Sequence, residues 1–250
     1  MMKHIYAFED IKEYEFHKER IQRFSKRLEE YQYILEKDYL LMDQPKGIVW
    51  TSAEAATTVF SEIPIPAFTN KNTIYITPDL SAWRKLFLQQ LDGKDLPHIE
   101  RFYEELSENH ILQILGHELT HHSDLFLEDF DDEREDSIWF EEGMCEYLPR
   151  KFLLTEKECD EITAVEEELV DVFSEEYGGR SIDEFGSGSY TSSLSSIMFD
   201  YWRSYLYVKH LVEVRFKHDI QAVFEEYHKW DQEGRRCSLS EYFELGKVSL

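Results

Sequence analysis

The stretch ILGHELTHHSD (Ile114–Asp124) combines apolar residues with histidine and carboxylate side chains at helical spacing. His117 and His121 stand four residues apart, so on an α-helix both imidazoles lie on one face, one turn from each other. Apolar neighbours favour burial of this helix against a core: Ile111, Leu112, Ile114, Leu115 and Leu119. We therefore predict a buried helix over residues 108–126 that directs two histidines toward one point.

Two imidazoles on one helical face can bind a single metal ion. Glu118 lies beside them in the chain and can accept a proton from a water molecule at that ion. Zinc suits this arrangement, because it accepts histidine nitrogen and carboxylate oxygen and keeps a fourth position open in catalytic sites. The pattern predicts Zn²⁺ at His117 and His121 with Glu118 as general base. The alternative is a helix with two packed or exposed histidines and no metal.

A catalytic zinc site needs a third protein ligand. Metzincins carry glycine and then histidine or aspartate after the second histidine, but Asp124 and Leu127 occupy those positions, so that class is excluded. The segment SIWFEEGMCEYLPRKF (Ser137–Phe152) follows downstream and holds two adjacent carboxylates, Glu141 and Glu142.

The core of this segment, WFEEGMCEY (Trp139–Tyr147), resembles the W-L-x-E-G-x-A-x-Y segment of the aminopeptidase N family, which belongs to the gluzincins. The resemblance implies that Glu142, the glutamate before the glycine, is the third zinc ligand. Glu141 is the rival, and it lies about 100° around the helix, so at most one of the two faces the metal well. The resemblance covers roughly residues 73–227, and it implies a zincin-like metallopeptidase domain.

Further roles near the metal follow from the same resemblance. Thermolysin-like gluzincins keep a carboxylate four residues after the glutamate ligand, which here is Glu146. Such a carboxylate orients a ligand histidine, although Glu146 is equally well read as a solvated charge. Asp124 is a weaker candidate for that role, and His122 is expected to be a packed or surface histidine.

The segment DYWRSYLYVKHLVEVRF (Asp200–Phe216) resembles the aminopeptidase stretch that begins Y-E-K-G. The resemblance implies that Tyr201 donates a hydrogen bond to the oxyanion of the reaction, with Ser204 in place of the family's glycine. Tyr190 and Tyr205 are alternatives, and tyrosines on a core-facing helix are the ordinary reading of this pattern. The family's amine-anchoring Gly-x-Met-Glu-Asn motif does not precede HELTH, so an aminopeptidase specificity is not implied.

Hydropathy predicts an α+β fold that is predominantly α, with a small sheet early in the chain and a helical C-terminal half. The resemblance implies that this fold is zincin-like. An amphipathic helix over residues 9–39 buries Ile21, Phe24, Leu28, Tyr31 and Leu35. This helix could cover a cleft, prop the core or contact a second chain. Strands are expected at Gly47–Ser52 and Thr73–Thr77, and the second resembles the edge strand that pairs with extended peptides in zincins.

The remaining expected helices are 80–91, 97–106, 133–148, 155–177, 195–216, 219–230 and 239–245, with a short one over 53–60. Pro149 is expected to end the helix over 133–148, and residues 178–193 are expected to be a Gly- and Ser-rich loop. We predict one domain over residues 1–250. It comprises an N-terminal helical segment (1–45), the sheet with the histidine helix (46–130), and the helical part with the glutamate ligand (131–250).

Composition narrows the partners. The chain has 52 acidic and 27 basic residues, a net charge of −25, which repels phosphate backbones and argues against nucleic acid. The N-terminus lacks an apolar signal core and no stretch is long enough to span a bilayer, so we expect a cytoplasmic protein without a membrane partner. An odd cysteine count without CxxC spacing disfavours disulfides and thiolate zinc: Cys145, Cys159 and Cys237.

The expected function is a zinc-dependent peptidase that acts on a peptide or protein substrate. Two alternatives stay open: a zinc-binding interaction or sensor module with a gluzincin fold, and a structural helical protein. The sequence leaves the substrate, the choice between endo- and exopeptidase action, and the oligomeric state open.

Overall fold

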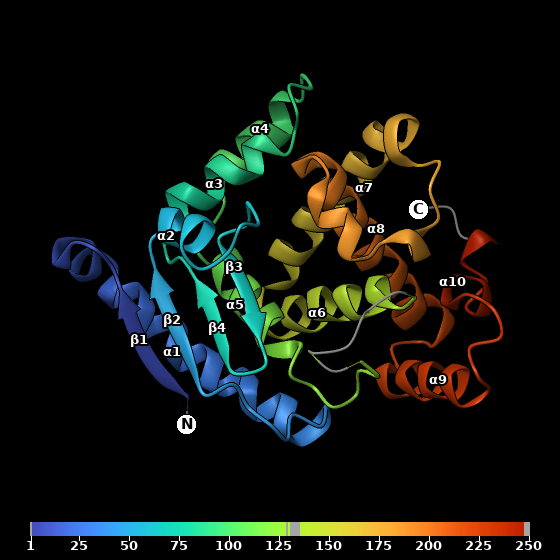
Figure 1. Cartoon of the computed structure of the whole chain (residues 1–250). Helices are drawn as coiled ribbons and strands as arrows, with labels where there is room; N and C mark the ends of the chain where they lie inside the picture. Colours follow the sequence, from blue (N-terminus) through green and yellow to red (C-terminus); the bar gives the residue numbers. More distant parts are fainter. Residues whose placement is uncertain (1, 129, 131–135, 248–250) are drawn as a thin grey trace. The chain divides into compact units, whose positions relative to one another are not determined.

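The computed structural model describes residues 2–128, 130 and 136–247, and within them it is α+β, mostly helical with a four-stranded sheet (Figure 1). The contacts divide the chain into two compact units. Unit 1 comprises the chain through Asp124 together with Leu148–Thr155, and unit 2 comprises Leu125–Tyr147 and the chain from Glu156 onward. One helix, α6 (Ile138–Leu153), supplies residues to both units. That they act as one catalytic domain stays a prediction.

The sheet of unit 1 is mixed, with the order β1-β2-β4-β3. Its strands are β1 (Lys3–Ala7), β2 (Gly47–Thr51), β3 (Ala67–Asn70) and β4 (Thr73–Ile76). β1, β2 and β4 run parallel, whereas β3 and β4 form an antiparallel hairpin. Asn70 closes this hairpin, since its Oδ1 accepts the backbone N–H groups of Asn72 and Thr73 at 3.0 Å each.

The prediction that Thr73–Thr77 is an edge strand is wrong. β4 lies between β2 and β3, so its backbone pairs with a strand on each side. β3 ends the sheet instead, and neither β3 nor β1 was predicted. Both are short end strands, and none of the side chains of β1 is fully buried. Their pairing with neighbours, rather than an alternating apolar pattern, makes them strands.

The helix α1 (Ile11–Asp38) has the apolar face that its sequence predicts, and all five predicted residues are at most 2% exposed: Ile21, Phe24, Leu28, Tyr31 and Leu35. It packs along α5 (Asn109–Thr120), and in Figure 1 both helices run behind the sheet.

Polar contacts fix the register of α1 along α5. Arg27 of α1 donates to Asn109 Oδ1 at 2.6 Å, and Tyr31 lies one turn later, with its hydroxyl 2.7 Å from Thr120 Oγ1. Since both residue numbers rise together, the two helices run parallel. The early amphipathic helix therefore props the histidine helix within unit 1.

The other elements of unit 1 are α2 (Ala53–Thr58), α3 (Leu80–Gln89) and α4 (Pro97–Glu104). Unit 2 contains α7 (Glu156–Tyr177), η1 (Ile182–Glu184), η2 (Ser187–Thr191), α8 (Leu194–His210), η3 (Leu211–Arg215), α9 (Ile220–Gln232), α10 (Leu239–Tyr242) and η4 (Leu245–Lys247). The Gly- and Ser-rich segment between α7 and α8 thus forms short 3-10 turns. Across the described ranges, none of the helices combines the length and the apolar character needed to cross a bilayer.

The prediction that Pro149 ends its helix is wrong, because α6 continues to Leu153 with Pro149 inside it. The predicted start at residue 133 lies outside the described residues, and α6 begins at Ile138. A Cβ added to Gly116 of α5 would meet Leu153 Cδ1 at 2.6 Å and Pro149 Cβ at 2.8 Å. This close packing of the last turn of α6 against a glycine offsets the hydrogen bond that a proline removes.

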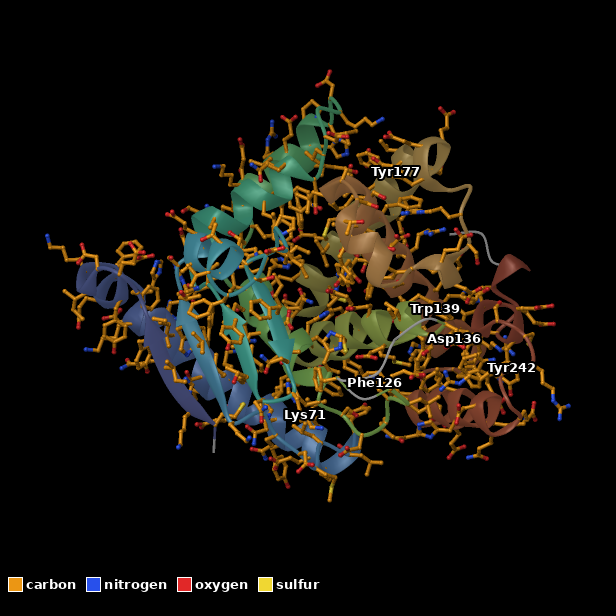
Figure 2. The ribbon with its side chains drawn as sticks, viewed as in Figure 1. Lys71, Phe126, Asp136, Trp139, Tyr177 and Tyr242 are labelled. Atoms are coloured by element: carbon orange, nitrogen blue, oxygen red, sulfur yellow. The ribbon has the colours of Figure 1, made fainter. Side chains whose placement is uncertain are left out.

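The beginning of α6 is anchored by Trp139, which is labelled in Figure 2 and fully buried. Its indole Nε1 donates to Asp183 Oδ1 at 3.1 Å, and the same oxygen accepts the Ser240 N–H at 3.1 Å. The tryptophan of the WFEEG segment thereby ties α6 to η1 and to the start of α10, all within unit 2. The beginning of α6, which carries Glu141 and Glu142, is therefore anchored within unit 2.

Candidate metal centre

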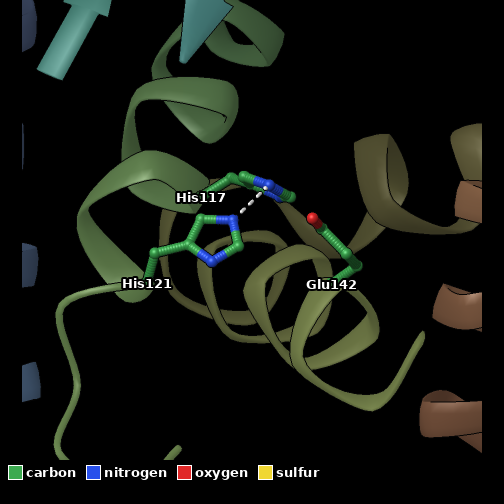
Figure 3. Close-up of side chains that lie close together, drawn as sticks. All are labelled: His117, His121 and Glu142. Carbon is green, nitrogen blue, oxygen red and sulfur yellow. Dashed lines mark hydrogen bonds between the residues drawn. The ribbon is translucent and has the colours of Figure 1, made fainter. Parts of the chain in front are cut away.

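Three side chains that the sequence predicts as ligands lie together. His117 and His121 come from α5 and its C-terminal end, and Glu142 comes from α6 (Figure 3). One potential ligand atom from each lies within 4.8 Å of the others. The His117 and His121 Nε2 atoms are 3.1 Å apart, with their rings inclined at 73°. His117 and Glu142 are buried, and His121 is half-buried.

This donor set fits a zinc ion. Zinc bonds to histidine nitrogens at about 2.0–2.1 Å in a tetrahedron, which places two ligand nitrogens about 3.4 Å apart. The 3.1 Å between the two Nε2 atoms is close to that separation. Two imidazoles that share a proton would lie at a similar distance. A shared proton, however, does not account for the Glu142 carboxylate in the same group, whereas a metal ion does. Two nitrogens and one carboxylate are a common ligand set of catalytic zinc.

Glu118 follows His117 on α5 and is 7% exposed, so the predicted general base is buried beside a predicted ligand. The end of α5 that carries these residues is held by Thr120. Its hydroxyl donates to the Gly116 carbonyl at 2.7 Å and lies 2.7 Å from the Tyr31 hydroxyl. The helix that presents the histidines and Glu118 is therefore fixed by α1 at its C-terminal end.

The rival glutamate, Glu141, is also buried, at 3% exposure. Among the described residues, the group that could hold a metal includes Glu142 and not Glu141. Glu141 instead acts on a core tyrosine. Burial raises the pKa of Tyr227 above its ordinary value, and the neighbouring Glu141 carboxylate raises this pKa further. Adjacent helical positions differ by a rotation of about 100°, and of the two carboxylates only that of Glu142 joins the histidines in this group.

Two tyrosines extend the site from Glu142 within unit 2. The Tyr190 hydroxyl donates to Glu142 Oε1 at 3.0 Å, and the Tyr201 hydroxyl lies 3.1 Å from the Tyr190 hydroxyl. Phe185, which is 1% exposed, packs against both phenol rings, with centroids at 5.3 Å from Tyr201 and 6.1 Å from Tyr190. Tyr201 is thus two hydrogen bonds from the predicted ligand, and Tyr190 contacts that ligand directly.

Comparisons with protein-family models, with curated proteins and with solved structures give no match to this chain. The basis for a function of this chain is therefore the geometry of the candidate metal centre and the sequence segments that form it.

The second alternative tyrosine, Tyr205, belongs to the core. It is 1% exposed, and its hydroxyl lies 2.8 Å from Thr163 Oγ1 on α7. A phenol held in this way between two helices contributes to packing and to the polar network of unit 2. Of the two alternatives to Tyr201, only Tyr190 contacts a predicted ligand through a contact that the structure records.

The remaining predicted residues have separate positions. Asp124 is exposed, and its Oδ2 accepts the Met42 backbone N–H at 3.1 Å, so it serves a turn of unit 1 rather than a histidine. His122 is packed as expected, with Nε2 2.8 Å from Thr69 Oγ1 of β3. Burial, and next the charge of His121, lower the pKa of His122 to about 3. Glu146 is half-buried, one turn after Glu142.

The glycine of the WFEEG segment has a steric role that sequence reasoning missed. A Cβ on Gly143 would collide with the Ser204 carbonyl and with Val208 Cγ2. The absence of a side chain therefore lets α6 and α8 cross in contact, next to Glu142 and one turn from Tyr201. The available signal was a glycine inside a predicted helix. Such a glycine lowers helix stability and usually has a packing reason.

Proposed function

We propose that the protein is a zinc-dependent peptidase of the gluzincin type that hydrolyses peptide bonds with water. His117, His121 and Glu142 are the proposed ligands, and Glu118 is the proposed general base. The observation that carries the proposal is the convergence of the two imidazoles and the Glu142 carboxylate within 4.8 Å, with Glu118 buried on the same helix. The resemblance of the segments Trp139–Tyr147 and Asp200–Phe216 to segments of the aminopeptidase N family supports the proposal.

The proposed mechanism assigns each residue a task. A zinc ion, when bound, polarises the substrate carbonyl and lowers the pKa of water to about 7. Glu118 takes the proton from the attacking water and passes it to the leaving amine. Tyr201 turns its hydroxyl toward the carbonyl oxygen and donates a hydrogen bond as negative charge develops there. A phenol can do this without losing its proton, because its ordinary pKa is about 10.

The end strand β3 is the proposed place for the substrate backbone, in place of the internal β4. An extended peptide can add to the end of a sheet through main-chain hydrogen bonds. β3 is joined to the histidine segment by the Thr69–His122 contact of 2.8 Å, so a peptide along β3 would run close to His121. Main-chain hydrogen bonds of this kind recognise the backbone of a peptide and do not select its side chains.

The proposal is tested by Glu118→Gln, a substitution of nearly equal size that removes the base. We expect one zinc ion per chain in both proteins and a kcat at least about 100-fold lower in the variant, since general-base catalysis contributes about 10²–10⁴-fold. Zinc is measured by elemental mass spectrometry, and cleavage by mass spectrometry of a mixed peptide library.

Two outcomes would contradict the proposal. Unchanged turnover in Glu118→Gln would remove Glu118 from the mechanism. Wild-type protein that holds one zinc ion and leaves every peptide of the library intact would instead favour a zinc-binding interaction or sensor module.

A further inference from the structure

The Glu142 carboxylate meets a phenol at one of its two oxygens. Tyr190 donates to Oε1 at 3.0 Å, which is a normal hydrogen-bond length to a carboxylate. This contact lies within unit 2 and links η2 to α6. It is independent of the resemblance, which places no residue at Tyr190.

The direction of the hydrogen bonds follows from counting hydrogens. An ionised carboxylate only accepts, so the single hydroxyl hydrogen of Tyr190 points to Glu142. The Tyr190 oxygen is then the acceptor in its 3.1 Å contact with Tyr201, whose hydroxyl donates. Two phenols in series polarise each other, which strengthens the bond to the carboxylate.

The position of Tyr190 is built into its surroundings. Ser189, the residue before it, is 7% exposed, and its hydroxyl accepts the Gly186 N–H at 3.2 Å, which closes the turn η2. Phe185 packs against the Tyr190 ring at a centroid distance of 6.1 Å. Tyr190 is half-buried, and its ring is positioned by Phe185 and by the closed turn that carries it.

We infer that Tyr190 is a positioning residue that restricts Glu142 to metal binding through one oxygen, Oε2. The inference rests on the proposed zinc site. A carboxylate can bind a metal through one or both oxygens, and a hydrogen bond at Oε1 opposes the second mode. With two histidine nitrogens and one carboxylate oxygen, zinc keeps a fourth position for water or substrate. Both carboxylate oxygens on the metal, with water or substrate still in the fourth position, would raise the coordination number to five.

The test is Tyr190→Phe, which removes only the hydroxyl. Loss of a residue that orients a ligand weakens metal binding by about 10–100-fold, and we expect the zinc Kd of the variant to rise by that factor. Cobalt(II) in place of zinc reports the coordination number, because four-coordinate cobalt absorbs visible light more strongly than five-coordinate cobalt. We expect the visible bands of the cobalt protein to weaken in Tyr190→Phe.

The matched control is Tyr205→Phe, which removes a core phenol from the neighbouring region without touching Glu142. We expect its zinc Kd and cobalt spectrum to equal those of the wild type. X-ray absorption at the zinc edge of the wild-type protein counts the ligands without any substitution, and we expect four nitrogen or oxygen ligands rather than five. This second measurement decides the question even if Tyr190→Phe does not fold.

The outcomes separate the two proposals. Wild-type protein that binds no zinc would overturn the proposed function, and the inference with it. Wild-type protein that binds zinc, with an unchanged cobalt spectrum in folded Tyr190→Phe or with five nitrogen or oxygen ligands on the metal, would overturn the inference alone.

Discussion

Tyr201 and Tyr205 lie one turn apart on α8, yet their hydroxyls meet different partners. The Tyr201 hydroxyl lies 3.1 Å from that of Tyr190, whereas the Tyr205 hydroxyl lies 2.8 Å from Thr163 Oγ1 in the core. We predict that Tyr201→Phe lowers kcat by about 100-fold or more, the cost of losing one oxyanion donor. We predict that Tyr205→Phe lowers the free energy of unfolding by about 1 kcal/mol and spares kcat.

Steady-state kinetics and urea titration of the two variants measure these effects. Equal losses of kcat in both variants would mean that the phenols act through packing, and an unaffected kcat in Tyr201→Phe would remove Tyr201 from the mechanism.

At the scale of residues, the sequence predicts which side chains lie close together when they belong to the same helix. His117 and His121 are neighbours in space because a helical turn makes them so. Tyr190 is different, because it reaches Glu142 from a turn rich in Gly and Ser, 48 residues away in the chain. Its role depends on tertiary packing, and no spacing rule connects it to the ligand.

The helices α6 and α8 depend on Gly143 for their crossing. A Cβ at this position would collide with the backbone carbonyl of Ser204, which cannot move without shifting α8. We predict that Gly143→Ala lowers the free energy of unfolding by about 1–3 kcal/mol, as overpacking does. The zinc Kd should rise as well, because Glu142 precedes Gly143.

Gly179 provides the matched control, since a Cβ there has nothing within 4 Å. Thermal unfolding and zinc titration of Gly143→Ala and Gly179→Ala compare the two positions. If Gly143→Ala were as stable as the wild type, α6 and α8 could move apart without a loss of stability. That result would contradict the role of Gly143 in their crossing.

At the scale of elements, the sequence predicts the long helices well and the short strands poorly. The apolar spacing of α1 alone predicts its buried face, because every residue of that face contributes to the pattern. β1 and β3 carry little such pattern and form through pairing with β2 and β4. The prediction that Pro149 ends its helix failed for a related reason. The packing of Leu153 and Pro149 against Gly116 is a tertiary contact, and it outweighs the local tendency of proline to end a helix.

At the scale of the whole molecule, the net charge of −25 affects any test of the metal centre. An acidic surface attracts divalent cations nonspecifically, so bound metal by itself does not identify a site. Removing a single ligand leaves the surface charge almost unchanged while it disrupts the centre. The decisive comparison is therefore between proteins that differ by one side chain.

The most direct measurement is a zinc titration against a competing chelator in wild type, His117→Ala, Glu142→Ala and Glu141→Ala. We predict one tightly bound zinc ion per chain in the wild type and in Glu141→Ala, and loss of that site in the other two variants. Zinc binding in the wild type that is no tighter than in His117→Ala, or a tight site that survives in Glu142→Ala, would contradict the proposed metal centre.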